Sequence, residues 1–286
     1  PVPLRPREAA PALPSLLEED APAEGSYYVQ NVYESDPALP PDTPVTHLRI
    51  VQVLPKSTSG ANNPTVGAAN ASPGKQVLGT VPVETDGSAY FTAPAGKALA
   101  FQALDASGQA VQVMRSVSYL QPGEKASCVG CHENRMDAPP PAEVKTLALR
   151  RPPSAIEPAP DGSLPLSYPI LVQPVLDKHC VECHGDTRAD GPEGNPIRLT
   201  GKPEGRYTES YNALVSRVSY AAWGRGGVFP EGNCEPLAQP GFFGATGSAL
   251  TKLLEAGHHD VQLEDEDWER LITWMDANAL FYGTFE

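Results

Sequence analysis

Alternating apolar and polar residues fill the chain from about residue 26 to residue 120. The runs are rich in β-branched and aromatic side chains, and turns such as Thr85-Asp86-Gly87 separate them. Short strands at regular spacing, joined by Asp or Gly turns, are typical of an antiparallel β-sandwich, so we expect about seven strands here. The clearest runs are 47–54, 77–83, 89–92, 98–104 and 110–114.

Helical spacing of apolar residues takes over in the last third of the chain. Residues 168–179 form one such pattern. A second segment follows Thr208 or Ser210, which are suited to cap a helix, and a third follows Ser248. Residues 263–275 begin with acidic side chains that suit a helix N-terminus, and their apolar residues share one face. These patterns predict a mostly α-helical domain.

The predicted fold class is therefore α+β, with four segments along the chain. Residues 1–25 are a Pro/Ala/Glu-rich extended arm. The β-sandwich takes residues 26–136, a Pro-rich linker takes 137–164, and the helical domain takes 165–286. The linker is expected to be extended and semi-rigid because proline restricts the backbone.

The pentapeptide Cys-x-x-Cys-His occurs twice, as Cys128, Cys131 and His132 and again as Cys180, Cys183 and His184. Two thiols three positions apart can add to the two vinyl groups of a haem, and the His after the second Cys then ligates the iron. The sequence therefore predicts two covalently attached haem c groups. One belongs to the end of the β-sandwich, and the other belongs to a cytochrome c-like helical domain.

Four cysteines also allow a single zinc site or a pair of redox disulfides. Zinc ribbons usually separate their Cys pairs by roughly 15–20 residues, whereas residues 132–179 lie between the pairs here. A zinc site leaves both motif histidines unexplained, and no βαβ pattern surrounds either pair, as a thioredoxin-type motif requires. The fifth cysteine, Cys234, is expected to be a buried or inert thiol, with a disulfide to another chain as the alternative.

Each iron also needs a group on its far side. For the second haem the natural choice is the pair His258 and His259, which follows Gly257 in a turn between two helices. We favour His258, and two His ligands would give a low redox potential. An open position on the first haem would instead permit catalysis. The choices for the first haem are His47, His179, Met114, Met136 or an open position.

Acidic residues outnumber basic ones by 35 to 21, which gives a formal net charge of −14. Nucleic acid and anionic membrane surfaces are therefore poor partners, and a basic redox protein is a favourable one. No apolar run reaches the roughly 18 residues of a membrane span. Because haem is attached to such motifs outside the bacterial cytoplasm, we expect a periplasmic or extracellular protein, present as a processed form or a fragment.

Several stretches of the sequence resemble those of a known family. They are residues 81–91, 101–105, 114–116, 121–124, 127–133, 257–258, 268, 272–279 and 282–283. They resemble the middle and C-terminal haem domains of the hydrazine synthase alpha subunit family. The family's C-terminal haem has two His ligands, which implies His184 with His258 here. Its middle-domain haem is an open site served by a Tyr four residues after the motif His, and Met136 stands at that position here.

We expect an exported dihaem cytochrome that passes electrons between its haems and to a partner protein. Copies of the chain could also stack into a conductive filament, with the N-terminal arm clasping a neighbour. The alternative is an enzyme whose first haem is five-coordinate and acts on a small nitrogen or oxygen species, as the resemblance implies. The sixth ligand of the first haem distinguishes these two functions, and a structural zinc protein would show no Soret absorption.

Overall fold

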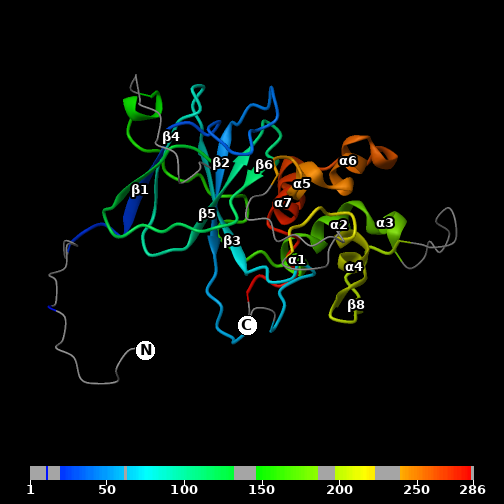
Figure 1. Cartoon of the computed structure of the whole chain (residues 1–286). Coiled ribbons are helices and arrows are strands. Elements are labelled where there is room, and N and C mark those ends of the chain that lie inside the picture. Colours follow the sequence, from blue (N-terminus) through cyan, green and yellow to red (C-terminus); the bar gives the residue numbers. More distant parts are fainter. Residues whose placement is uncertain are drawn as a thin grey trace, which may run out of the picture.

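The structure of the chain is a computed structural model that describes residues 11, 20–60, 63–131, 146–185, 197–222 and 239–284. It confirms the predicted mixture of strands and helices, with the large sheets in the N-terminal part. The strand-rich part and the helical part lie side by side, as Figure 1 shows. The predicted arm, residues 1–25, falls mostly outside the described residues.

The N-terminal part contains two sheets that face each other. The three-stranded sheet has the order β4 (Ala89–Pro94), β1 (Glu24–Val29), β7 (Lys125–Cys128). The four-stranded sheet has the order β3 (Lys75–Pro82), β2 (His47–Val53), β5 (Leu99–Leu104), β6 (Ala110–Val113). Apolar side chains between the sheets form one core, in which the rings of Tyr27, Phe91 and Phe101 lie 5.0–5.7 Å apart. Every second residue of β4 points into this core, as the pleat of a strand requires.

One strand pairing differs from the all-antiparallel sandwich that the sequence predicted. β1 and β7 run parallel, with Val29 opposite Cys128. Parallel neighbours need a long crossover, and here the chain builds the four-stranded sheet and β4 before it returns to β1. The pairing continues past the strand ends, because Asn31 donates its backbone N–H to the Val129 carbonyl at 3.0 Å. The backbone of the first Cys pair is therefore tied to β1.

The described α-helices are α1 (Tyr168–Leu171), α2 (Gln173–His179), α3 (Val181–His184), α4 (Glu209–Val215), α5 (Gly244–Gly247), α6 (Ala249–Glu255) and α7 (Asp265–Asp276). Two 3-10 turns, η1 (Ala148–Arg150) and η2 (His258–Asp260), and a small hairpin, β8 (Pro203–Glu204) with β9 (Tyr207–Thr208), complete the elements. The helix expected over 168–179 is two helices, because Pro174 lacks an N–H and fits the first turn of a new helix.

The helical part has its own apolar core, built around the second half of α7. The ring of Trp274 packs against the rings of Tyr168 and Tyr211, with centroid distances of 5.1 and 6.2 Å. Its indole N–H donates to the Leu280 carbonyl at 2.8 Å. The predicted cap of the helix after residue 208 is confirmed, since the Thr208 hydroxyl accepts the backbone N–H of Tyr211 at 3.3 Å. These contacts anchor the helices that surround the second Cys pair.

A buried ion pair joins the two parts. Arg49 on β2 reaches the Asp276 carboxylate at the end of α7 at 2.8 Å, and the two side chains are 3% and 0% exposed. Asp276 also accepts the backbone N–H groups of Ala110 and Ala245, at 3.1 and 2.8 Å. A buried charge is tolerated only when it is paired and hydrogen-bonded in this way.

Two connecting segments, the loop 56–75 and the predicted Pro-rich linker, pack against structured parts of the protein. Part of the loop 56–75 enters the helical core, where the Tyr211 hydroxyl accepts the N–H of Ala68 and donates to the Ala279 carbonyl. The described end of the Pro-rich linker runs along the sandwich, and Ser154 forms a backbone bridge with Phe91. The linker is extended because its backbone pairs with strands.

Among the described residues, none of the helices combines the length and the apolar character that crossing a membrane would take.

Candidate functional site

The second Cys pair lies where α2 passes into α3. The backbone N–H of Cys180 bonds the Leu176 carbonyl at 2.8 Å, and that of His184 bonds the Cys180 carbonyl at 2.9 Å. Helical residues three and four positions apart share one face. Cys180, Cys183 and His184 are therefore presented together on one side of the turn.

A backbone contact fixes the orientation of the His184 ring. Its Nδ1 lies 3.0 Å from the carbonyl oxygen of Ile197. A carbonyl can only accept, so Nδ1 carries the proton and Nε2 keeps its lone pair. The Leu199 N–H also bonds the His184 carbonyl at 2.9 Å, which holds this segment against α3. A hydrogen bond of this kind orients His ligands and raises their basicity in metal sites.

His258 faces His184 across a narrow gap. The two ring centroids are 6.0 Å apart and the ring planes differ by 18°. Gly257, with φ of 83°, turns the chain at the end of α6 and presents His258 at the start of η2. The ring of His259 lies edge-on to that of His258, at 4.6 Å and 75°, and it is the more exposed of the two. The geometry favours His258 over its neighbour as the residue opposite His184.

The gap suits a metal held by both rings. A metal–nitrogen bond of about 2 Å on each side, with the half-width of each ring added, sums to about 6 Å. Burial, followed by the nearby His259 and His184, lowers the pKa of His258 below its usual range. A neutral imidazole is the form that ligates a metal. His184 and His258 are therefore spaced so that they could hold one metal ion between them.

The state of Cys180 bears on the disulfide alternative. Burial, with the neighbouring Cys183, raises the pKa of the Cys180 thiol to about 11. Reactive Cys-x-x-Cys motifs instead have a lowered thiol pKa. The surroundings of Cys180 are thus unlike those of a redox-active cysteine.

The first Cys pair is attached to the sandwich. Cys128 is the last residue of β7, and both Cys128 and Cys131 are half-buried against the core between the sheets. A side chain at Gly130 would collide with the backbone of Glu34, so only glycine fits at position 130. His132, Met136 and Cys234 lie outside the described residues.

Three other proposed ligands of the first haem have definite places. His47 begins β2 in the opposite sheet, is exposed, and has Nδ1 3.1 Å from the Thr46 hydroxyl. His179 ends α2, and its Nε2 lies 2.8 Å from the Asp267 carboxylate. Met114 follows β6 and lines a cavity between the two parts of the protein.

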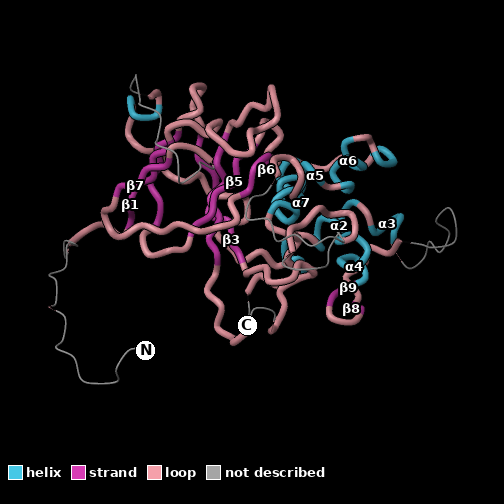
Figure 2. The backbone as a smooth tube through the Cα atoms, viewed as in Figure 1, coloured by secondary structure: helices cyan, strands magenta, loops and turns pink. Residues whose placement is uncertain are grey.

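The two Cys pairs lie far apart. Figure 2 shows β7 and α3 towards opposite ends of the molecule, with the other sheet and α7 between them. Packed sheets lie about 10 Å apart and packed helices about 8–10 Å, so the steps from β7 to the second sheet, to α7 and to α2 sum to about 30 Å. No group of three or more His, Cys, Asp or Glu side chains in the described ranges is placed to hold a metal. One zinc site shared by both Cys pairs is therefore not formed.

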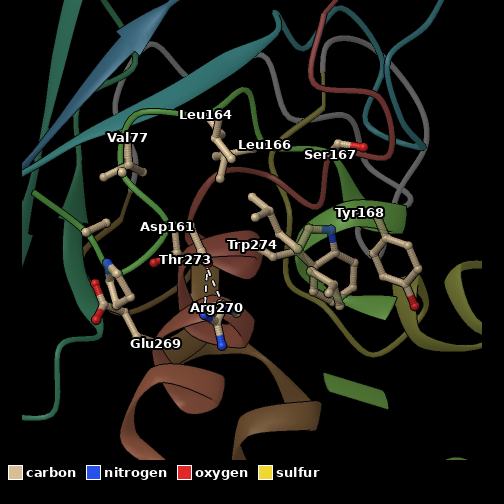
Figure 3. A pocket seen from close by; sticks show the side chains of 15 residues that line it. Val77, Asp161, Leu164, Leu166, Ser167, Tyr168, Glu269, Arg270, Thr273 and Trp274 are labelled. Carbon is tan, nitrogen blue, oxygen red and sulfur yellow. Dashed lines mark hydrogen bonds and ion pairs between the residues drawn. The ribbon is translucent and has the colours of Figure 1, made fainter. Parts of the chain in front are cut away.

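The sequence analysis missed an ionic network beside the second Cys pair. Asp267 on α7 binds His179, Lys178 at 3.0 Å and Arg270 at 2.7 Å. Arg270 also bonds both oxygens of Asp161 from the linker at 2.8 Å, and Figure 3 shows this pair at a small apolar pocket beside α7. Asp267 belongs to an acidic run expected at a helix start, so only the fold reveals its partners.

Comparisons with known proteins place these sites in a broader context. Residues 44–133 match the family model described as the hydrazine synthase alpha subunit middle domain. A search of curated protein sequences found no significant match. In fold, the chain is similar to the solved structure of Kuenenia stuttgartiensis hydrazine synthase, with a TM-score of 0.58 and 17% identity over 92% of this chain. The match covers only 44% of that chain. The chain is thus similar in sequence to the hydrazine synthase alpha subunit middle domain over residues 44–133, and similar in fold to hydrazine synthase over most of its length.

Proposed function

We propose that the chain is an exported c-type cytochrome with two covalently attached haems. Cys180 and Cys183 would attach the second haem, and His184 and His258 would ligate its iron. The observation that supports this proposal most directly is the pair of facing imidazoles of His184 and His258. Their ring centroids are 6.0 Å apart, and Nδ1 of His184 is bonded to a carbonyl. The first haem would be attached through Cys128 and Cys131, with His132 as its motif ligand.

The arrangement around His184 suits electron transfer. When bound, haem supplies an iron that cycles between the ferrous and ferric states. His184 and His258 together would leave no position for a substrate. The Ile197 carbonyl holds the proton on Nδ1 of His184, and the Asp267 network holds the end of α2 against α7. A site fixed in this way changes its charge with little movement of the protein.

The layers between the two Cys pairs refine the predicted path of the electrons. Tunnelling falls off exponentially with distance, and about 30 Å of packed protein separates the pairs. We propose that each haem exchanges electrons mainly with a partner at its own end of the molecule. With a formal net charge of −14, the chain would attract a basic redox protein. A filament of copies of this chain is the variant, and a monomeric elution profile would contradict it.

A second candidate function concerns the first haem alone. The family match, residues 44–133, includes Cys128, Cys131 and His132 and comes from the alpha subunit of hydrazine synthase. A five-coordinate iron there would make the chain an enzyme acting on a small nitrogen or oxygen species.

Haem content tests the proposal. The intact chain, expressed with a haem-attachment system, should show the mass of two haems under denaturing conditions. Cys128→Ser/Cys131→Ser and Cys180→Ser/Cys183→Ser should each retain one haem, and Cys234→Ser should retain both. A colourless protein, or one that binds zinc through these cysteines, would overturn the proposal.

A further inference from the structure

A cavity of about 360 Å³ lies between the sandwich and the end of α7, apart from both Cys pairs. Its walls come from the end of β2, the start of β3, β6 and the residues after it, and the turn that follows α7. Ligand sites commonly have volumes of roughly 300–1,000 Å³ and lie at boundaries between domains. The volume and position of this cavity are therefore those of a small-molecule site.

The polar lining contains basic and acidic side chains. Lys75 and Arg115 both line the cavity. The acid in the wall, Asp276, is already neutralised by its ion pair with Arg49. Within the described ranges Lys75 forms no ion pair, and its ammonium makes one hydrogen bond, to the Ala277 carbonyl at 3.0 Å. An ammonium has three donors, so Lys75 can donate further hydrogen bonds.

Asn278 and several apolar side chains also line the wall. The amide of Asn278 is bonded on both sides, to Ser72 at 3.1 Å and to the backbone of Ala221 at 2.7 Å. Val113, Met114 and Met275 supply an apolar surface. A ligand would therefore place a charged end at Lys75 and an alkyl end against the methionines.

The backbone supports the same assignment. Ala71, which also lines the cavity, has φ of 58°. A left-handed alanine costs roughly 1–2 kcal/mol, and such conformations concentrate at ligand sites. Burial lowers the pKa of Lys75 to about 8, which makes the amine easier to neutralise unless an anion joins it.

We infer that this cavity binds a small organic carboxylate, with Lys75 pairing with the carboxylate group and the methionine side receiving the alkyl chain. The inference does not depend on haem, so it stands or falls separately from the proposed function.

Calorimetric titration of the full haem-loaded chain with acetate, butyrate, hexanoate and inorganic sulfate tests the site. Butyrate or hexanoate should bind more tightly than acetate, and sulfate should bind weakly. Lys75→Met should weaken binding by about tenfold or more, since a charge-assisted contact is lost. Lys56→Met is the matched control, because that ammonium bonds Thr58 and the Asn63 carbonyl elsewhere. It should bind like the native chain.

A second measurement works on the unaltered sequence. Acylation of lysines at pH 8, mapped by mass spectrometry, should modify Lys75, and hexanoate should protect it while leaving Lys56 reactive. Affinity for hexanoate should fall as the pH rises above about 8 and stay level in Lys75→Met. Equal binding by Lys75→Met, sulfate binding without carboxylate binding, or no binding and no protection by any of the four anions would each overturn the inference.

Discussion

Arg49 on β2 and Asp276 on α7 form a buried ion pair 2.8 Å long that joins the two parts of the protein. Arg49 also donates to Gln102 at 2.9 Å and to the Gly108 carbonyl at 3.0 Å, so its guanidinium is held from three sides. The separation between the two Cys pairs is therefore set by packing rather than by a swinging linker.

Breaking this pair should destabilise the whole chain. Arg49→Met should lower the free energy of unfolding by roughly 3–5 kcal/mol, because Asp276 is left as an unpaired buried charge. Denaturant titration measures the loss. Arg151→Met is the control: its ion pair with Glu84 is about 30% exposed and should contribute about 1 kcal/mol or less. Equal losses in the two variants would contradict this role for the buried pair.

The same variant predicts a change with pH. In the folded Arg49→Met protein, burial raises the pKa of the unpaired Asp276 above that in the unfolded chain. Protonation then favours the folded state, so mild acid should restore part of the lost stability. An additional Asp276→Asn change should remove that pH response. A double variant that still regains stability in acid would show that another group is responsible.

Gly257 should matter for presenting His258. It has φ of 83°, and a methyl group added there meets no atom within 4 Å, so the cost of Gly257→Ala is conformational, about 1 kcal/mol. Gly205→Ala is matched, with φ of 65° and equally open space. Both variants should lose similar stability in thermal unfolding. Only Gly257→Ala should alter the visible spectrum, and unchanged spectra in both would contradict the role of this turn.

His258 should control the redox potential of the second haem. Replacing a His ligand by Met raises the potential of c-type haems, so His258→Met should move one of two midpoint potentials upward in a spectroelectrochemical titration. His259→Met should leave both potentials close to their native values, because His259 contacts His258 but not His184. The reverse result would assign the ligand to His259.

Asp267 should make the protein sensitive to strong acid. The hydrogen bond from His179, with Lys178 and Arg270, holds the pKa of Asp267 at about 2, below its ordinary value of 3.8. The stability from this network is therefore complete above about pH 4 and is lost as the pH falls through about 2. Asp267→Asn should lower the free energy of unfolding by roughly 1–3 kcal/mol at pH 7. It should also reduce the loss of stability that occurs as the pH falls from about 4 to about 2. Glu266→Gln, in an exposed pair, should change the unfolding free energy by about 0.5 kcal/mol or less. If Asp267→Asn loses stability in acid as the native chain does, Asp267 is not the group responsible.

The sequence predicted what local chemistry determines. Asp86-Gly87 marks a tight turn, since Gly87 has φ of 81° and the Asp86 carboxylate accepts the N–H of Ser88 at 3.0 Å. Ser248 precedes α6 as expected, and the apolar face of α7 is buried. Helix starts and turns of this kind depend on residues within one or two turns of each other.

Features that join distant parts of the chain could not be predicted in this way. The parallel pairing of Val29 with Cys128 depends on where the chain returns after building the second sheet. The hydrogen bond from His184 to Ile197 uses a backbone carbonyl, which no side-chain pattern marks. The preference for His258 over His259 was expected from its position after Gly257, but the near-parallel ring facing His184 depends on the fold.

The central claim is that His184 and His258 together hold one iron. Low-temperature EPR of the oxidised protein, with Soret and α bands recorded before and after carbon monoxide is added to the reduced form, tests it most directly. The account predicts a low-spin signal from the second haem that His258→Ala converts to high spin, with new carbon monoxide binding, while His259→Ala leaves it unchanged. A high-spin second haem in the native chain, open to carbon monoxide, would contradict the claim.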